Sequence, residues 1–143
     1  MRKRLFAICM CFGVLAWGLM PQIVSANIVY DGFETAVPYM TYIQSNEAHL
    51  SISAGGTASI ECYASGKSGT VTSMHLDAEL QQYKDGKWQL YKRYSVVSKS
   101  SSASISQSVS VEKGYSYRLK GTAYAYVTTL AESGTAYSAQ VWY

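Results

Sequence analysis

Apolar and polar residues alternate with a period of two along most of this chain, and this pattern limits its fold more than any other feature. Side chains of a β-strand point alternately to opposite faces of a sheet, so the alternation predicts strands with one buried face. No convincing helical period follows Leu19. The alternating stretches are residues 57–64, 71–83, 88–96, 103–111 and 115–127.

Each alternating stretch has a predicted inner face. Lys92 breaks the pattern of residues 88–96, which indicates a bulge or a sheet edge. Gln107 falls on an inner face and needs a hydrogen-bond partner there. The other side chains predicted to point inward are Ala58, Ile60, Cys62, Ala64, Met74, Leu76, Ala78, Leu80, Trp88, Leu90, Tyr94, Val96, Ile105, Val109, Val111, Tyr117, Leu119, Ala123 and Ala125.

Turns and loops separate the predicted strands at short intervals. Asp85-Gly86 is typical of a two-residue hairpin, because Gly accepts a positive φ without steric cost. About seven to eight short strands result, which favours a single antiparallel β-sandwich over a closed barrel. The remaining predicted pieces are extended segments over 39–44, 50–53 and 136–143, turns over 54–56, 66–69 and 112–114, and loops over 98–102 and 128–135.

Two segments of the chain resemble immunoglobulin-like domains. Residues 50–62, which read LSISAGGTASIEC, are similar to a strand, a Gly turn and a second strand that leads to a core cysteine. Residues 112–119, which read EKGYSYRL, are similar to the E–F corner and strand F. The resemblance implies an immunoglobulin-like strand order, with Tyr117 as the corner tyrosine and Leu119 in the place of a partner for Cys62.

The chain also resembles a family of small secreted, uncharacterised proteins of Gram-positive bacteria. The shared pattern comprises the strand-Gly-strand with Cys62, the hairpin from Leu80 to Trp88, the Ser-rich strand over 104–110 and the run from Lys113 to Leu119. The family has no assigned activity. The resemblance therefore implies export and the β-sandwich, and it implies no site residues.

Residues 1–26 have the three parts of a secretory signal peptide. These are the basic Arg2-Lys3-Arg4, an apolar run over 5–19 and the small residues Val24-Ser25-Ala26. The apolar run is shorter than the ~20 residues of a membrane span. We expect a signal-peptide helix that is cleaved between Ala26 and Asn27, a short leader over 27–38, a β-sandwich over 39–143, and a secreted protein without a membrane span.

Cleavage would change both the charge and the cysteine content. Of the 12 Lys and Arg residues, three lie in residues 2–4, so 9 basic residues would remain against 9 acidic ones. A neutral domain has no electrostatic attraction for nucleic acid or an anionic membrane. Cys9 and Cys11 would leave with the signal peptide. We interpret Cys62 as a small buried hydrophobic residue, with an intermolecular disulfide as the alternative.

The sequence contains no catalytic, cofactor-binding or metal-binding motif. His75, Asp77 and Glu79 lie in one outward row, which is typical of a solvated polar face. Exposed carboxylates lack the apolar pocket that raises the pKa of a catalytic acid. We expect instead that Asp77 and Glu79 face Arg118 and Lys120 on an adjacent antiparallel strand. The predictions are no enzyme activity, no cofactor and no metal.

Outward aromatic residues form the candidate binding site. Tyr91, Tyr124, Tyr126 and Trp142 are predicted to share the outer face of one sheet, although outward Tyr is also common in strands that bind nothing. Rigid amphipathic rings can anchor a protein partner or stack on sugar rings. The sequence favours a secreted, non-enzymatic module for protein interaction or adhesion. A carbohydrate-binding module for glycans and a secreted toxin or antimicrobial are the alternatives.

Overall fold

The computed structural model describes residues 40–143, which form β-strands and no helix. The predicted signal peptide, its cleavage site between Ala26 and Asn27, and the leader over 27–38 lie outside the described residues. Nothing in the described range is a helix long and apolar enough to cross a membrane. The all-β prediction is confirmed. The strands are β1 (Ile43–Ile52), β2 (Thr57–Gly66), β3 (Ser73–Lys84), β4 (Lys87–Ser98), β5 (Ser102–Ser110), β6 (Ser116–Tyr126), β7 (Leu130–Tyr137) and β8 (Val141–Trp142).

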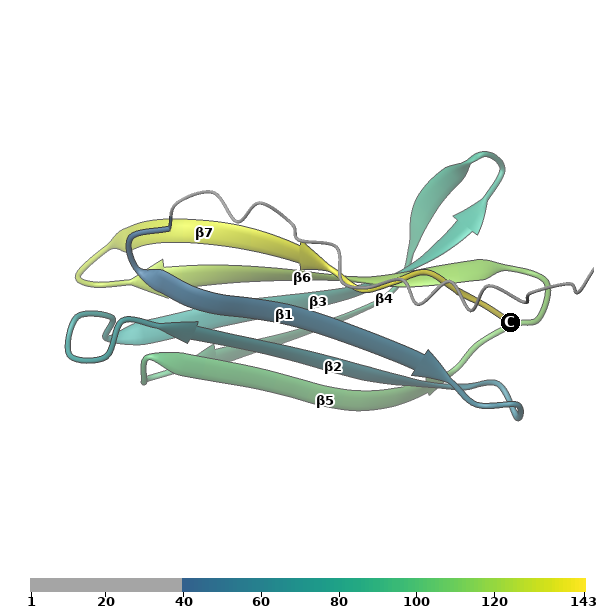
Figure 1. Ribbon diagram of the computed structural model, residues 1–143, viewed down its shortest axis with the longest axis horizontal. Helices are drawn as coiled ribbons and strands as arrows, with labels where there is room; N and C mark the ends of the chain where they lie inside the picture. Colours follow the sequence, from purple (N-terminus) through teal and green to yellow (C-terminus); the bar gives the residue numbers. More distant parts are fainter. Residues whose placement is uncertain (1–39) are drawn as a thin grey trace, which may run out of the picture. The chain divides into compact units, whose positions relative to one another are not determined.

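The strands form two antiparallel sheets that pack face to face (Figure 1). The smaller sheet has the order β1-β2-β5. The larger sheet has the order β4-β3-β6-β7, and the short β8 pairs with β6. The turn end of the β3–β4 hairpin, drawn in teal, projects away from the smaller sheet.

The core lies between the two sheets and confirms the inner faces predicted for β2, β3 and β6. Each of these strands has a hydrogen-bonded neighbour on both sides, so its inner side chains are covered by the opposite sheet and flanked by adjacent strands. Full burial of a Leu or Ile side chain contributes about 1.5–3 kcal/mol. The predicted inner side chains that are at most 2% exposed are Ala58, Ile60, Cys62, Ala64, Met74, Leu76, Ala78, Leu80, Tyr117, Leu119, Ala123 and Ala125.

The predicted Asp85-Gly86 turn joins β3 to β4. Asp85 has φ 54° and Gly86 has φ 76°. Positive φ at both central residues is what a type I′ turn requires. Lys84 and Lys87 form the closing pair of the hairpin.

Two predictions for the outer strands are wrong in their boundaries. Residues 39–44 and 50–53 are not two separate pieces, because β1 runs unbroken from Ile43 to Ile52. The predicted loop over 128–135 is mostly β7, and the predicted last strand over 136–143 is divided between the end of β7 and β8.

A β-bulge lies in β4, next to the Lys92 at which the sequence pattern breaks. Lys92 pairs with Leu80 and Leu90 pairs with Gln81, so Tyr91 is an extra residue without a partner on β3. The predicted bulge is confirmed. A bulge bends its strand and increases the local twist, which accounts for the projecting end of the hairpin.

The bulge reverses the faces predicted for the first part of β4. Leu90 opposes an outward residue of β3 and is 53% exposed, and Trp88 opposes the outward Tyr83. The prediction that Trp88 and Leu90 point into the core is therefore wrong. Gln107 also differs from its prediction: it is exposed on β5, an edge strand, and needs no buried partner.

Tyr117 fastens the turn between β5 and β6. Its side chain is fully buried, and its hydroxyl donates to the carbonyl oxygen of Glu112 at 2.9 Å and accepts from the backbone N–H of Glu112 at 3.0 Å. Gln82 Nε2 donates to the same hydroxyl at 2.8 Å, which satisfies a buried amide. These three bonds connect the turn after β5 to the core face of β3.

Glu132 of β7 holds the residues that lead into β1. Its carboxylate accepts three backbone N–H groups, from Thr41 at 2.8 Å, Tyr42 at 2.8 Å and Ile43 at 2.7 Å. Burial alone would raise the pKa of Glu132, but the three hydrogen bonds together lower it below its ordinary value of 4.5. The carboxylate thus links the two sheets at this edge.

Candidate binding surface

The structure separates the four residues predicted to form one binding face. Tyr91 packs against the core, where its ring lies edge-on to the buried Tyr117 at a centroid distance of 5.6 Å. Its hydroxyl donates to the carbonyl oxygen of Ser110 on the opposite sheet at 3.1 Å. The prediction that Tyr91 points outward is therefore wrong, and the cause is the bulge at this residue.

Tyr124, Tyr126 and Trp142 do point outward from the larger sheet, but not together. Trp142 pairs with Ser116 near the start of β6, whereas Tyr124 and Tyr126 lie near its end. At about 3.3 Å per residue, Trp142 and Tyr124 are roughly 26 Å apart along the strand. These side chains cannot form one compact site.

The hairpin end of the larger sheet carries a group of exposed aromatic and apolar side chains around one arginine. Tyr83 is 45% exposed, Leu90 53%, Tyr137 50% and Trp142 69%. Exposed apolar side chains that gather on one face often mark an interaction site. We call this group the aromatic patch; it consists of Tyr83, Trp88, Leu90, Arg118, Tyr137 and Trp142.

Arg118 is the centre of the aromatic patch. Its guanidinium carbon lies 4.4 Å from the ring centroid of Trp88 and 4.6 Å from that of Tyr137. Its Nε donates to Gln81 Oε1 at 2.8 Å. Trp88 in turn meets Tyr83 edge-on at 5.2 Å. Cation–π contacts of this kind hold the planar guanidinium in one orientation.

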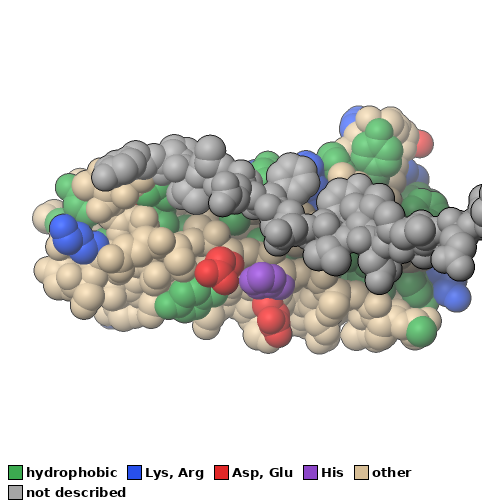
Figure 2. All heavy atoms as spheres, viewed as in Figure 1, with side chains coloured by type: hydrophobic (Ala, Val, Ile, Leu, Met, Phe, Trp, Pro, Cys, Tyr) green, Lys and Arg blue, Asp and Glu red, His purple; other side chains and the backbone are tan. Residues whose placement is uncertain are grey.

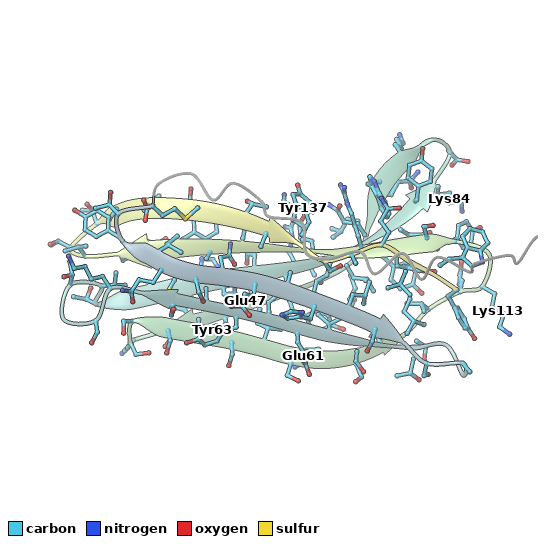
Figure 3. All side chains as sticks on the ribbon, viewed as in Figure 1. Glu47, Glu61, Tyr63, Lys84, Lys113 and Tyr137 are labelled. Carbon is cyan, nitrogen blue, oxygen red and sulfur yellow. The ribbon has the colours of Figure 1, made fainter. Side chains whose placement is uncertain are left out.

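The terminal amino groups of Arg118 have no ion-pair partner within residues 40–143. Lys84 and Lys87 pair next to the hairpin turn on the other face of the sheet, where Lys84 Nζ lies 5.7 Å from the ring centroid of Tyr115. Figure 3 labels Lys84 at this hairpin and Tyr137 on the larger sheet. The charge of the aromatic patch is therefore that of Arg118, a guanidinium with unused donors.

Acidic residues in the middle of the same sheet are paired internally. Glu79 binds Arg93 and also Lys120, the latter at 3.6 Å, which confirms the predicted pairing of Glu79 with Lys120. Asp77 instead contacts His75 Nε2 at 3.1 Å and the hydroxyl of Ser95. The expectation that Asp77 faces Arg118 or Lys120 is wrong, because the register places Asp77 opposite Thr122.

The outer face of the smaller sheet has the opposite character. Its strands contain Glu47 and Glu61 and no Lys or Arg. His49 lies opposite Glu61 and 3.5 Å from Glu47, and His49 and Glu61 border a shallow hollow. Figure 2 shows acidic side chains, in red, on either side of a histidine, in purple, and Figure 3 places Glu47, Glu61 and Tyr63 along the smaller sheet. Across residues 40–143, no group of three or more His, Cys, Asp or Glu side chains is arranged to hold a metal ion.

Cys62 is buried in the core, as predicted, with 2% of its surface exposed. Burial raises the pKa of its thiol from 9.0 to about 11. Its sulfur lies 3.2 Å from the position that a Cβ would take on Gly121, so a side chain at residue 121 would press against it. A thiol in this position is a packing group with little nucleophilic character at neutral pH.

Sequence reasoning missed most of the aromatic patch. The alternation, when it is continued through the bulge, places Trp88 and Leu90 in the core, and Tyr137 lies in a segment whose predicted boundary is wrong. The Lys92 that breaks the pattern was the available signal, since an extra residue there exchanges the two faces of the preceding residues.

No protein-family model matches the sequence, and no curated protein is significantly similar to it.

Proposed function

We propose that this chain is an exported, non-enzymatic β-sandwich module of immunoglobulin-like type that binds an extracellular protein through the aromatic patch. Two features support the immunoglobulin-like type. If β1 to β7 are strands A, B, C, C′, E, F and G, the sheets are A-B-E and C′-C-F-G. Tyr117 near the start of strand F bonds to the backbone five residues upstream. Export rests on the signal-peptide pattern of residues 1–26.

The arrangement of Arg118 between Trp88 and Tyr137 carries the proposal for protein binding. Trp, Tyr and Arg are the residue types most enriched at the energetic centres of protein interfaces. The stack fixes these side chains before binding, so less conformational entropy is lost on association. The unused donors of Arg118 suit a carboxylate of the partner. The partner is therefore expected to present an acidic group beside an apolar surface.

A binding comparison with matched variants tests this proposal. The patch variant combines Leu90→Ala, Tyr137→Ala and Trp142→Ala, and the control combines Tyr63→Ala and Val97→Ala, which are 44% and 70% exposed outside the patch. Immobilised wild-type protein and the control should retain the same surface protein from the producing organism, identified by mass spectrometry. The patch variant should lose it. Retention by the patch variant, or equal loss by the control, would contradict the proposal.

Glycan binding is the second candidate, and the exposure of Trp142 favours it. At 69% exposure, this ring offers an open face on which a sugar can stack. A glycan array probed with wild-type protein and Trp142→Ala distinguishes the two candidates. Array binding that Trp142→Ala abolishes would favour the glycan, whereas an empty array with protein capture would favour the protein partner.

A further inference from the structure

The outer edge of β5 presents backbone N–H and C=O groups, and no residue of β5 belongs to the aromatic patch. β5 pairs with β2 alone, so it forms one edge of the smaller sheet. Residues of an antiparallel strand direct their N–H and C=O groups alternately to one side and the other. Ser101 accepts from Gly66 N at 2.7 Å and Val111 donates to the carbonyl oxygen of Gly56 at 2.9 Å. Odd-numbered residues therefore face β2, and even-numbered residues face the open edge.

Both ends of this open edge are closed by side chains. The hydroxyl of Ser100 donates to the carbonyl oxygen of Ser102 at 2.9 Å and accepts from its N–H at 3.3 Å. At the other end, the hydroxyl of Tyr91 donates to the carbonyl oxygen of Ser110 at 3.1 Å. Between these caps, Ser104, Ser106 and Ser108 present outward N–H and C=O groups to which nothing in residues 40–143 bonds.

β5 also lacks the features that keep sheet edges from pairing with other chains. Edge strands are normally protected by charged side chains, proline or a bulge. β4 has a bulge and several basic residues, and β1 and β7 each have an irregular register with their neighbour. β5 reads SASISQSVS, with no charge and no proline, and its register with β2 is regular throughout.

We infer that the open edge of β5 pairs with β5 of a second copy of this chain, as an antiparallel dimer with its two-fold axis at Ser106. This register places Ser104 opposite Ser108 of the second copy and joins the two smaller sheets into one. Serine faces serine in each outward pair, so no like charges meet and hydroxyl groups can bond across the strands. A closed two-fold arrangement uses the same surface on both copies.

An antiparallel pair lets the outward N–H and C=O groups of the even-numbered residues in both copies meet as directly opposed, hydrogen-bonded pairs. The charged residues that flank β5 do not set the direction. Lys99 precedes the strand, and Glu112 and Lys113 follow it. In the antiparallel dimer, Lys99 of each copy therefore lies beside a Glu112–Lys113 pair that has no net charge. Because a short strand edge buries little area, the dimer is weak and depends on protein concentration.

Sedimentation of purified protein with paired variants tests the dimer. Wild-type protein should move from the monomer mass toward twice that mass as its concentration rises into the millimolar range. Ser106→Pro removes an N–H that points to the open edge and leaves the β2–β5 ladder intact, so it should remain monomeric with an unchanged thermal midpoint. Ser106→Ala keeps the N–H and should dimerise like the wild type. A wild type that stays monomeric throughout, or a Ser106→Pro variant that dimerises equally, would refute the inference.

Amide hydrogen exchange of the wild type gives a second measurement that does not depend on a proline variant folding. On dilution, exchange should accelerate at Ser104, Ser106 and Ser108, while Ile105 and Gln107, which bond to β2, should keep their rates. Protection of the three serines that does not change with concentration would mean that another part of the same chain covers the edge. That result would also overturn the inference.

Discussion

At the scale of single residues, Tyr117 shows how one hydroxyl can serve three groups. It bonds to both backbone groups of Glu112 and to the side chain of Gln82, which is 8% exposed. The hydroxyl therefore connects the β5–β6 turn to the core face of β3. A phenylalanine of the same shape would keep the packing and lose all three bonds.

We predict that Tyr117→Phe lowers the free energy of unfolding by about 2 kcal/mol, because it leaves the buried Gln82 amide without a partner. Denaturation in urea measures this value. Tyr124→Phe is the control, since no hydrogen bond of the Tyr124 hydroxyl occurs within residues 40–143. Equal stability of Tyr117→Phe and the wild type would show that water satisfies the Gln82 amide and the Glu112 backbone equally well.

Residue-scale prediction from sequence succeeded where a strand lies between two neighbours. Leu76 and Leu119 had to point inward, because a slip of one residue would expose the whole apolar row. The prediction failed at Tyr91, because the bulge inserts one extra residue there. The insertion exchanges the two faces of the strand, and the residue types on these two faces are too similar for the sequence to show it. The prediction also assigned Trp142 to the same site as Tyr124, because alternation gives the face of a side chain and not its position along the sheet.

At the scale of elements, the edge strands were the hardest to predict. β7 contains Gly134, and a glycine in the sequence favours a loop. In the structure, Met40 packs so closely against Gly134 that a Cβ at residue 134 would collide with the Met40 side chain. β1 has a polar middle, and its inward Asn46 is satisfied at one atom: Nδ2 donates to the carbonyl oxygen of Gly134 at 2.9 Å, while Oδ1 is buried without a partner in residues 40–143. Both features depend on contacts between segments about 90 residues apart in the chain, which local patterns do not contain.

Glu132 gives the element-scale prediction, because it attaches the start of β1 to β7. A carboxylate with a lowered pKa contributes stability above its ordinary pKa of 4.5, and the contribution is lost as the pH falls through the lower folded-state value. We predict that Glu132→Gln destabilises the protein by about 1 kcal/mol at pH 7, a modest value because the site is partly solvated.

Thermal unfolding at two pH values measures this effect. At pH 7 the midpoint of Glu132→Gln should lie roughly 4–8 °C below that of the wild type, and at pH 3 the difference should shrink. Glu61→Gln, on the exposed face of the smaller sheet, should match the wild type at both pH values. A Glu132→Gln deficit that is equally large at pH 3 would show that the carboxylate charge has no part in the attachment.

At the scale of the whole molecule, the two sheets have one core between them. Neither sheet has a second, wholly apolar face. The outer face of the smaller sheet is polar, and the aromatic patch occupies only one end of the outer face of the larger sheet. Contacts such as Tyr91 to Ser110 and Glu132 to Ile43 connect the sheets at both sides. A domain with a single shared core should unfold in one cooperative transition.

The two sheets carry different natural probes with which to test that cooperativity. Trp88 and Trp142 lie in the larger sheet, and Cys62 lies in the smaller one. In a Trp17→Phe, Cys9→Ser, Cys11→Ser background, tryptophan fluorescence reports the larger sheet alone and Cys62 is the one thiol. Thiol labelling reports the smaller sheet, because the raised pKa of about 11 and the burial keep Cys62 unreactive until it is released. The two denaturation midpoints should coincide, since loss of either sheet exposes the core of the other. Labelling of Cys62 at a lower denaturant concentration would show that the smaller sheet opens first. In that case, a dimer paired through the β5 edge should delay this opening as the protein concentration rises.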